Sequence, residues 1–204
     1  MILKNECYEN ELAGIGIADG VGVTVLGNHS HHNRLAGIGF ADCERGDALV
    51  AENRLIDNGT VAAGVHQGWT VRFKGNTMSR KGGMPPIVMV FAGGEARMTS
   101  NTITGGGVAG IRVAGTLRAE ENKILGAAVR KVGPPNFAVW ALEGSKVHLA
   151  RNEIRSWRHA LVADKAEVEA TGNTVRNFHG EAFVVREPSA PPRIADNDVD
   201  PAAE

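Results

Sequence analysis

An asparagine returns at nearly constant intervals along the chain, and this repeat limits the fold more than any other feature. The intervals between successive asparagines are 21 to 30 residues, with a mean of 24. Apolar residues lie three and five positions before most of them and two positions after. This alternation predicts short strands with one face turned inward. The marker asparagines are Asn5, Asn28, Asn53, Asn76, Asn101, Asn122, Asn152, Asn173 and Asn197.

A second apolar motif recurs between the markers. It reads Ala-Gly-Ile-Gly-Ile at 13–17, Ala-Gly-Ile-Gly-Phe at 36–40 and Ala-Gly-Ile-Arg-Val at 109–113. Each unit therefore holds two or three short strands and cannot bury its apolar face alone, so consecutive units must stack around a shared core. We predict an all-β fold, a single-stranded right-handed parallel β-helix of about nine rungs that spans residues 1–204 as one domain. The sequence patterns of leucine-rich repeats, left-handed β-helices and β-propellers are absent.

The marker asparagines are expected to form a ladder at the bend after a strand. An amide can donate to one rung and accept from the next, which satisfies polar groups that a tight corner would bury. We also expect these asparagines to adopt the left-handed backbone conformation of the turn. A shorter second ladder is predicted at Asn10, Asn33 and Asn58.

Composition narrows the classes of partner and the compartment. The net charge is −1 and 22% of residues are charged, so we expect neither nucleic-acid nor membrane binding. Cys7 and Cys43 are expected to be free and mostly buried thiols. The chain shows no secretion signal, which leaves a cytoplasmic protein or a piece of an extracellular or periplasmic one. Because no cap precedes Asn5, we expect upstream rungs, a neighbouring domain or self-association at that end.

The spacing Asn28-x-x-x-x-Asn33-x-x-x-Gly37-Ile38, seen also from Asn5 to Ile15, resembles the parallel β-helix repeat of carbohydrate-binding proteins and sugar hydrolases. Similar patterns occur in pectate-lyase-like proteins, in an F-box protein, in a periplasmic protein of nitrous oxide reduction and in alginate epimerases. The resemblance covers nearly the whole chain. It implies a right-handed parallel β-helix whose ligand sites lie on the outer face of one sheet and on the loops beside it.

Three residues are unusual among the outward positions expected on the strands of the second motif. Trp140 could stack on a sugar ring, and Arg112 could hold a carboxylate beside His66. The alternative is that these are ordinary exposed or loop-covered residues. The expected outward row is Gly16, Gly39, His66, Val88, Arg112, Trp140, Val162 and Val184.

Asp19 and Asp42 each follow a marker by fourteen residues, so we expect them to stack on adjacent rungs about 5 Å apart. We predict no cofactor, although such a pair could bind Ca²⁺ or act as nucleophile and acid of a retaining glycosidase. The alternative is a plain turn, which Asp19-Gly20 indicates. His29, His31 and His32 lack the usual zinc spacing and are interpreted as surface histidines without a metal.

The longest interval between markers contains a loop at 126–136 with Arg130 and Lys131. Together with Arg80 and Lys81 it could form a basic rim for an acidic polysaccharide, the alternative being solvated loop charge.

Sequence signatures of the known β-helix enzymes are missing. The Asp-Pro-His-Glu motif of alginate epimerases and the motifs of polygalacturonases do not occur, and no pectate-lyase pattern is evident. We therefore predict a non-catalytic binding or scaffold domain that contacts a polysaccharide along its outer sheet face. One alternative is an enzyme (lyase, epimerase or hydrolase) acting on a uronate-containing glycan through Asp19, Asp42, His66 and Arg112. A protein-interaction module is the other.

Overall fold

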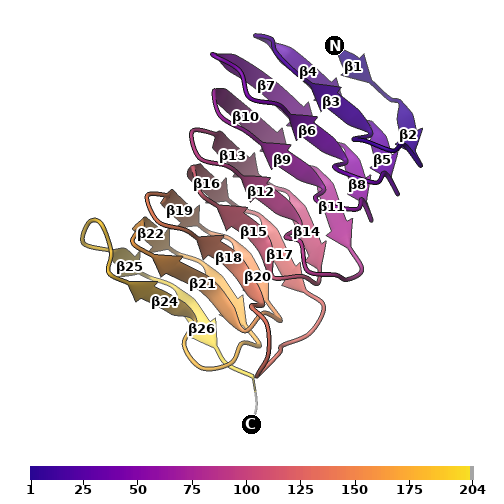
Figure 1. Cartoon of the computed structure of the whole chain (residues 1–204). Helices are drawn as coiled ribbons and strands as arrows, with labels where there is room; N and C mark the ends of the chain where they lie inside the picture. Colours follow the sequence, from indigo (N-terminus) through magenta and orange to yellow (C-terminus); the bar gives the residue numbers. More distant parts are fainter. Residues whose placement is uncertain (203–204) are drawn as a thin grey trace.

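The computed structural model describes residues 1–202, and in this range the chain forms 26 short strands and no helix. The chain coils around one axis, and strands of successive rungs pair in parallel to build three sheets (Figure 1). The prediction of a parallel β-helix with about nine rungs is confirmed. No helix in the described part of the chain is long and apolar enough to cross a membrane.

Sheet A consists of the nine strands that lead up to the marker asparagines. Inward and outward residues alternate along them, since Val71 and Phe73 are buried while Arg72 is exposed. Its strands are β1 (Ile2–Leu3), β4 (Val23–Leu26), β7 (Gly46–Ala51), β10 (Trp69–Lys74), β13 (Glu95–Thr99), β16 (Thr116–Glu120), β19 (Lys146–Ala150), β22 (Glu167–Thr171) and β25 (Arg193–Ala195).

Sheet B begins directly after each marker. Its central positions include Leu55, Met78 and Ile103, which are fully buried. Its strands are β2 (Glu6–Tyr8), β5 (His29–His31), β8 (Arg54–Ile56), β11 (Thr77–Arg80), β14 (Thr102–Gly105), β17 (Lys123–Gly126), β20 (Glu153–Arg155), β23 (Thr174–Arg176) and β26 (Asp198–Asp200).

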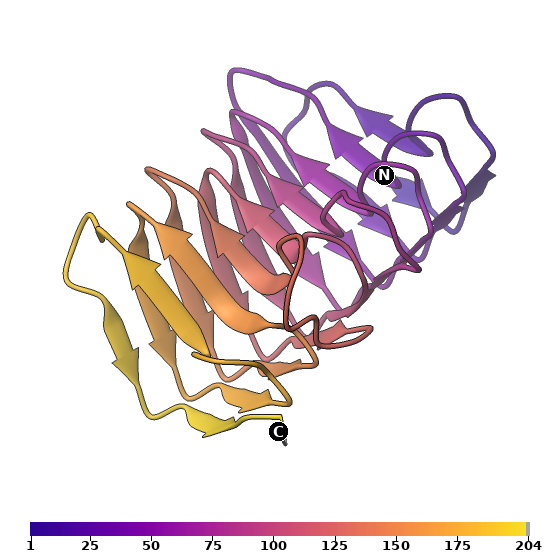
Figure 2. The same ribbon diagram turned by 60° about the horizontal axis from the view of Figure 1, so that its bottom comes forward.

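Sheet C is formed by the second motif and closes each rung. Its strands are β3 (Ile15–Ile17), β6 (Ile38–Phe40), β9 (Ala63–Val65), β12 (Val88–Val90), β15 (Ala109–Val113), β18 (Phe137–Ala141), β21 (His159–Asp164) and β24 (Phe183–Arg186). The long loop between β17 and β18 projects from the side where sheets B and C meet (Figure 2).

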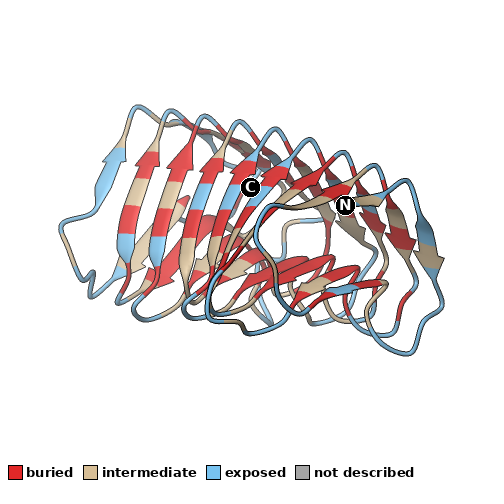
Figure 3. Cartoon of the chain, turned by 90° about the horizontal axis from the view of Figure 1, so that it is seen from above, coloured by how far each residue is buried: buried red, intermediate tan, exposed pale blue. Residues whose placement is uncertain are grey.

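The core is a continuous apolar column enclosed by the three sheets. Buried and more exposed residues alternate along most strands of sheets A and B, whereas several strands of sheet C, such as β9 and β12, are buried at every position (Figure 3). Trp69 and Trp157 are its largest side chains, and their Nε1 atoms donate to the carbonyls of Ala41 (2.7 Å) and Ile124 (3.2 Å). Both cysteines are free, and both are half-buried rather than mostly buried.

Both predicted asparagine ladders are present. In the main ladder the Nδ2 of each marker donates to Oδ1 of the next at 2.8–3.0 Å, from Asn5 to Asn197. The second ladder joins Asn10, Asn33 and Asn58 by bonds of 2.7 and 2.9 Å. Each buried amide thus provides hydrogen-bond partners for polar groups of its own rung and of the next one.

The expectation that the markers themselves adopt the left-handed conformation is wrong. In all nine rungs the residue just before the marker has the positive φ, as in Gly75 (63°) and Ser100 (55°). The chain bends there so that the asparagine side chain turns inward. Its Nδ2 can then reach the carbonyl two residues back, as Asn53 does with Ala51 at 2.9 Å.

Candidate functional site

The outer face of sheet A is hollowed along several rungs. Two adjoining hollows of about 300 Å³ each share Thr116 and Lys146 in their linings. The first also includes Arg118, His148 and Glu169, and the loop before β25 closes one side of it. The first hollow crosses β16, β19, β22 and β25, and the second lies where β10, β13, β16 and β19 begin; together they are called the groove.

A row of charged side chains lies along this face at equivalent positions of successive strands. Every member lies four residues before a marker asparagine and points away from the core. In pairing order the row, here called the arginine row, is Arg72, Arg97, Arg118, His148, Glu169 and Arg193. Pairing in register brings neighbours to about the 4.8 Å rung spacing at the backbone.

Most cations of the arginine row have a carboxylate partner on an adjacent strand or on their own strand. Arg97 Nε donates to Glu95 at 2.7 Å, and Arg193 reaches Glu169 at 3.1 Å. Arg118 differs, because no carboxylate of residues 1–202 lies within ion-pair distance of its guanidinium, which is exposed. Arg118 is therefore the cation most available to an added anion.

His148 and Glu169 form the closest polar contact in the row, with 2.9 Å between Nδ1 and Oε2. The hydrogen bond from His148 is the main cause that lowers the pKa of Glu169, and the charges of His148, Arg193 and Arg118 act in the same direction. Partial desolvation of the Glu169 carboxylate acts in the opposite direction and raises its pKa. Glu169 therefore remains ionised within a surrounding of cations.

The arginine row was missed by sequence reasoning, although its signal is visible. Counting back four positions from each marker gives arginine in four of nine rungs. His66, Arg112 and Trp140 depart more visibly from the repeat, because the second motif otherwise carries small or aliphatic residues there.

The expected outward row on sheet C is partly wrong. Pairing places Gly16, Gly39, Gly64, Met89, Arg112, Trp140, Val162 and Val184 at equivalent positions. Gly64 and Met89 thus replace His66 and Val88. His66 follows the end of β9, whose inward positions are Ala63 and Val65. Val88 is fully buried, because β12 begins 12 residues after its marker, whereas β3, β6 and β9 begin 10 residues after theirs.

Arg112 and Trp140 do lie side by side. Their strands pair in register, and the guanidinium carbon lies 5.0 Å from the centre of the indole ring. Both side chains are half-buried, and Arg112 Nε is shielded from solvent without a hydrogen-bond partner among the described residues. The pair can offer a sugar a flat surface and a cation.

His66 pairs instead with Asp42 and packs on Phe91. His66 Nδ1 lies 3.4 Å from Asp42 Oδ1, and the His66 and Phe91 rings are 3.9 Å apart. His66 and Arg112 lie two rungs apart, about 10 Å along the axis. A catalytic role of Asp42, His66, Arg112 and Trp140 remains a prediction.

Asp19 and Asp42 both lie in exposed turns of neighbouring rungs. Asp19 Oδ1 accepts the amide of Gly20 at 2.7 Å, and Asp42 Oδ1 accepts that of Gln67 at 3.2 Å, so both carboxylates have local partners. Burial raises the pKa of the Cys43 thiol, and the charges of Asp19 and Asp42 add to the effect. Calcium binding and catalysis by this pair remain predictions.

Two arginines organise the long loops between sheets B and C. Arg158 donates to the carbonyls of Arg130, Gly133 and Pro134, which leaves the side chains of Arg130 and Lys131 exposed. Arg80 donates to the carbonyls of residues 58, 59, 60 and 82 at 2.6–3.1 Å. These bonds fix the position of Arg80, whose acceptors are neutral carbonyls, and the basic rim remains a prediction.

The histidines at 29–32 have a carboxylate neighbour, Glu6, from the preceding rung. His29 and His31 point outward from β5 while Ser30 is fully buried, and Glu6 on the paired strand β2 lies beside them. Glu6 belongs to the preceding rung, so the spacing of the histidines alone gives no sign of it.

Comparison with known proteins supports the class of fold. A family model described as right handed beta helix region matches residues 1–78. The same three-strand rungs continue to Asp200, so the chain is a right-handed parallel β-helix protein. No curated protein and no solved structure matches it.

Proposed function

We propose that this protein is a non-catalytic binding module that lays an acidic polysaccharide along the outer face of sheet A. The observation that carries the proposal is the in-register arginine row beside the groove, with Arg72, Arg97 and Arg118 on three successive strands. Guanidinium groups bind carboxylates through two parallel hydrogen bonds, which suits a polymer of uronates.

The repeat of the protein matches the repeat of such a ligand. Rungs follow one another at ~4.8 Å, which is close to the length of one sugar unit in an extended chain. The asparagine ladders hold the rungs in place, so the backbone under the row is preorganised and the entropy lost on binding is that of the side chains. Ligand carboxylates would exchange with Glu95 and Glu169 as partners of the arginines and would reach Arg118 without displacing any group.

The test is binding of polygalacturonate, with a neutral glucan of similar length as the comparison polymer. We expect titration calorimetry to show binding of the acidic polymer alone. The double variant Arg97→Gln/Arg118→Gln should lose it, while Arg155→Gln, an exposed arginine on sheet B, should keep it. Equal binding by the double variant would contradict the assignment to sheet A.

The Arg112–Trp140 pair on sheet C is a second contact surface for a sugar ring, with His66, Arg130 and Lys131 as further contacts. A Trp140→Ala variant that lost binding while Arg97→Gln/Arg118→Gln retained it would move the ligand to this face. Binding of neither polymer would favour a protein-interaction module.

An enzyme acting on the same polymer is the alternative, because His148 is oriented by Glu169 within the groove at 2.9 Å. A histidine held in this way can transfer protons. Shortening of polygalacturonate during incubation, abolished by His148→Ala, would support catalysis over binding alone.

A further inference from the structure

We propose that Glu6, His29 and His31 form a binding site for a first-row divalent transition metal ion such as Zn²⁺, with His32 as an outer partner. The site lies on the outer face of sheet B, away from the groove of the proposed function, and is independent of it.

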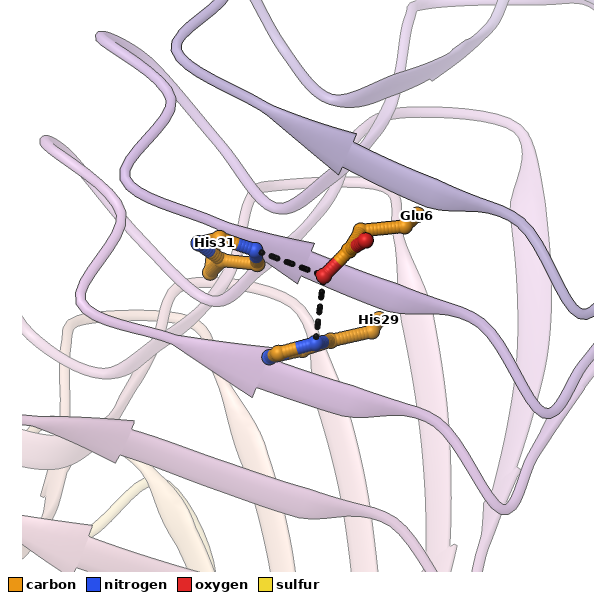
Figure 4. Close-up of side chains that lie close together, drawn as sticks. All are labelled: Glu6, His29 and His31. Atoms are coloured by element: carbon orange, nitrogen blue, oxygen red, sulfur yellow. Dashed lines mark hydrogen bonds and ion pairs between the residues drawn. The ribbon is translucent and has the colours of Figure 1, made fainter.

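Strand pairing assembles the three side chains. Strands β2 and β5 pair in parallel, with Glu6 opposite His29 and Tyr8 opposite His31. Because strand residues alternate, His29 and His31 share the outer face, as does Glu6 one strand away. The carboxylate of Glu6 lies between the two imidazole rings (Figure 4).

The distances match a metal site with little rearrangement. Glu6 Oε1 lies 3.4 Å from His29 Nδ1 and 3.3 Å from His31 Nε2. Ligands at ~2.0–2.1 Å from a tetrahedral zinc ion are ~3.3–3.4 Å apart, so both edges already have the required length. The two nitrogens lie within 4.8 Å of each other, and a modest rotation of the rings would close this third edge.

The surroundings orient His31 as a ligand. Its Nδ1 lies 2.8 Å from Nδ1 of His32, and its ring stacks on Tyr8 with 5.2 Å between centroids and 3° between planes. If His31 donates through Nδ1 to His32, its Nε2 lone pair faces Glu6. Metal-bound histidines are commonly held by such a bond from the second nitrogen.

The donor set selects the class of ion. Two imidazoles and one carboxylate suit Zn²⁺, Ni²⁺ or Cu²⁺, whereas Ca²⁺ and Mg²⁺ prefer oxygen ligands throughout. Three protein ligands at a partly exposed position leave room for water as the fourth. The positive charge of Arg54 opposes cation binding, because Arg54 pairs in register with His29 on the next strand.

Burial lowers the pKa of His29, and the charges of His31 and Arg54 lower it further. The charge of Glu6 and its hydrogen bond to His29 act in the opposite direction.

Titration calorimetry of the full chain, prepared without a histidine tag, tests the proposal with Zn²⁺, Ni²⁺ and Ca²⁺ at pH 7. We expect one Zn²⁺ or Ni²⁺ per chain and no Ca²⁺. Loss of His32 should weaken binding about 10-fold, as for other outer partners, and loss of His31 should weaken it more. The matched control is His179→Ala, which removes an exposed histidine far along the chain.

Two further readouts keep the test independent of folding. Arg54→Ala should tighten Zn²⁺ binding several-fold by removing a repelling charge, which a damaged fold could not do. A Co²⁺ complex should show the intense visible absorption of tetrahedral coordination, and Glu6→Gln should alter it. Unchanged Zn²⁺ binding by the triple variant Glu6→Gln/His29→Ala/His31→Ala would overturn the proposal, as would no saturable binding by the wild type.

Discussion

The side-chain amide of Asn101 donates to Oδ1 of Asn122 at 2.9 Å, and Oδ1 of Asn101 accepts from the amide of Asn76 at 2.8 Å. Asn101 also donates to the carbonyls of Phe73 and Thr99. One buried side chain thus satisfies polar groups of three consecutive rungs, which makes the middle of the ladder its most sensitive part.

Asn101→Ala should lower the free energy of unfolding by about 3 kcal/mol or more, because it leaves buried donors and carbonyls without partners. Urea denaturation followed by circular dichroism measures the loss. Asn197→Ala is the control, since that amide is only half-buried and water can replace it. Its cost should be about 1 kcal/mol. Equal losses at the two positions would contradict the role of burial.

Gly75→Ala should destabilise the chain by about 1 kcal/mol, because an added Cβ strains the left-handed conformation. The φ of Gly75 is 63° and no atom lies within 4 Å of the added Cβ, so strain alone is tested. Gly16→Ala is the matched control, with the same open space and no positive φ. It should be neutral or slightly stabilising in thermal melts.

Ser100→Gly is the converse change, since Ser100 holds the equivalent bend with a φ of 55°. Relief of the strain should raise the melting temperature, by an amount equivalent to up to about 1 kcal/mol. A lower melting temperature would show that the side chain of Ser100 stabilises the fold by more than its backbone strain destabilises it.

Glu169→Gln should destabilise the protein at pH 7 and have less effect in acid. The pKa of Glu169 is lowered in the folded protein, so its contribution is present above the unfolded value near ~4.3 and is lost as pH falls through the folded value. Urea midpoints of wild type and variant between pH 7 and pH 3 check this. A difference that stayed constant across the range would rule out the charge as its source.

Arg118→Gln should weaken polygalacturonate binding by about 10-fold, the range expected for a lost hydrogen bond to a charged group. The wild-type affinity should also fall as salt rises, because exposed charges are screened. Arg118 has no carboxylate within ion-pair distance in residues 1–202, so the variant removes no internal pair. Titration at low and high salt measures both effects, and a salt-independent affinity would argue against charge recognition.

The repeat was sufficient to predict the fold, the number of rungs and both ladders. The core and corner residues, such as Asn28 with Val23 and Val25, recur within each rung, and local alternation decides which side chains turn inward. The left-handed bend before each marker was not predicted, because a φ value is set by where the asparagine amide must point to reach the carbonyl two residues back.

The outer face was decided by the tertiary structure. Distances from the marker vary between rungs, so the pairing register was needed to place Met89 and Trp140 in line with Arg112. Equal distances from the markers already indicate that Arg97 neighbours Arg118 and that Glu6 neighbours His29, and the structure adds how their side chains meet. Outward side chains contribute little to the core, so the repeat leaves them free, and their neighbours are set by stacking.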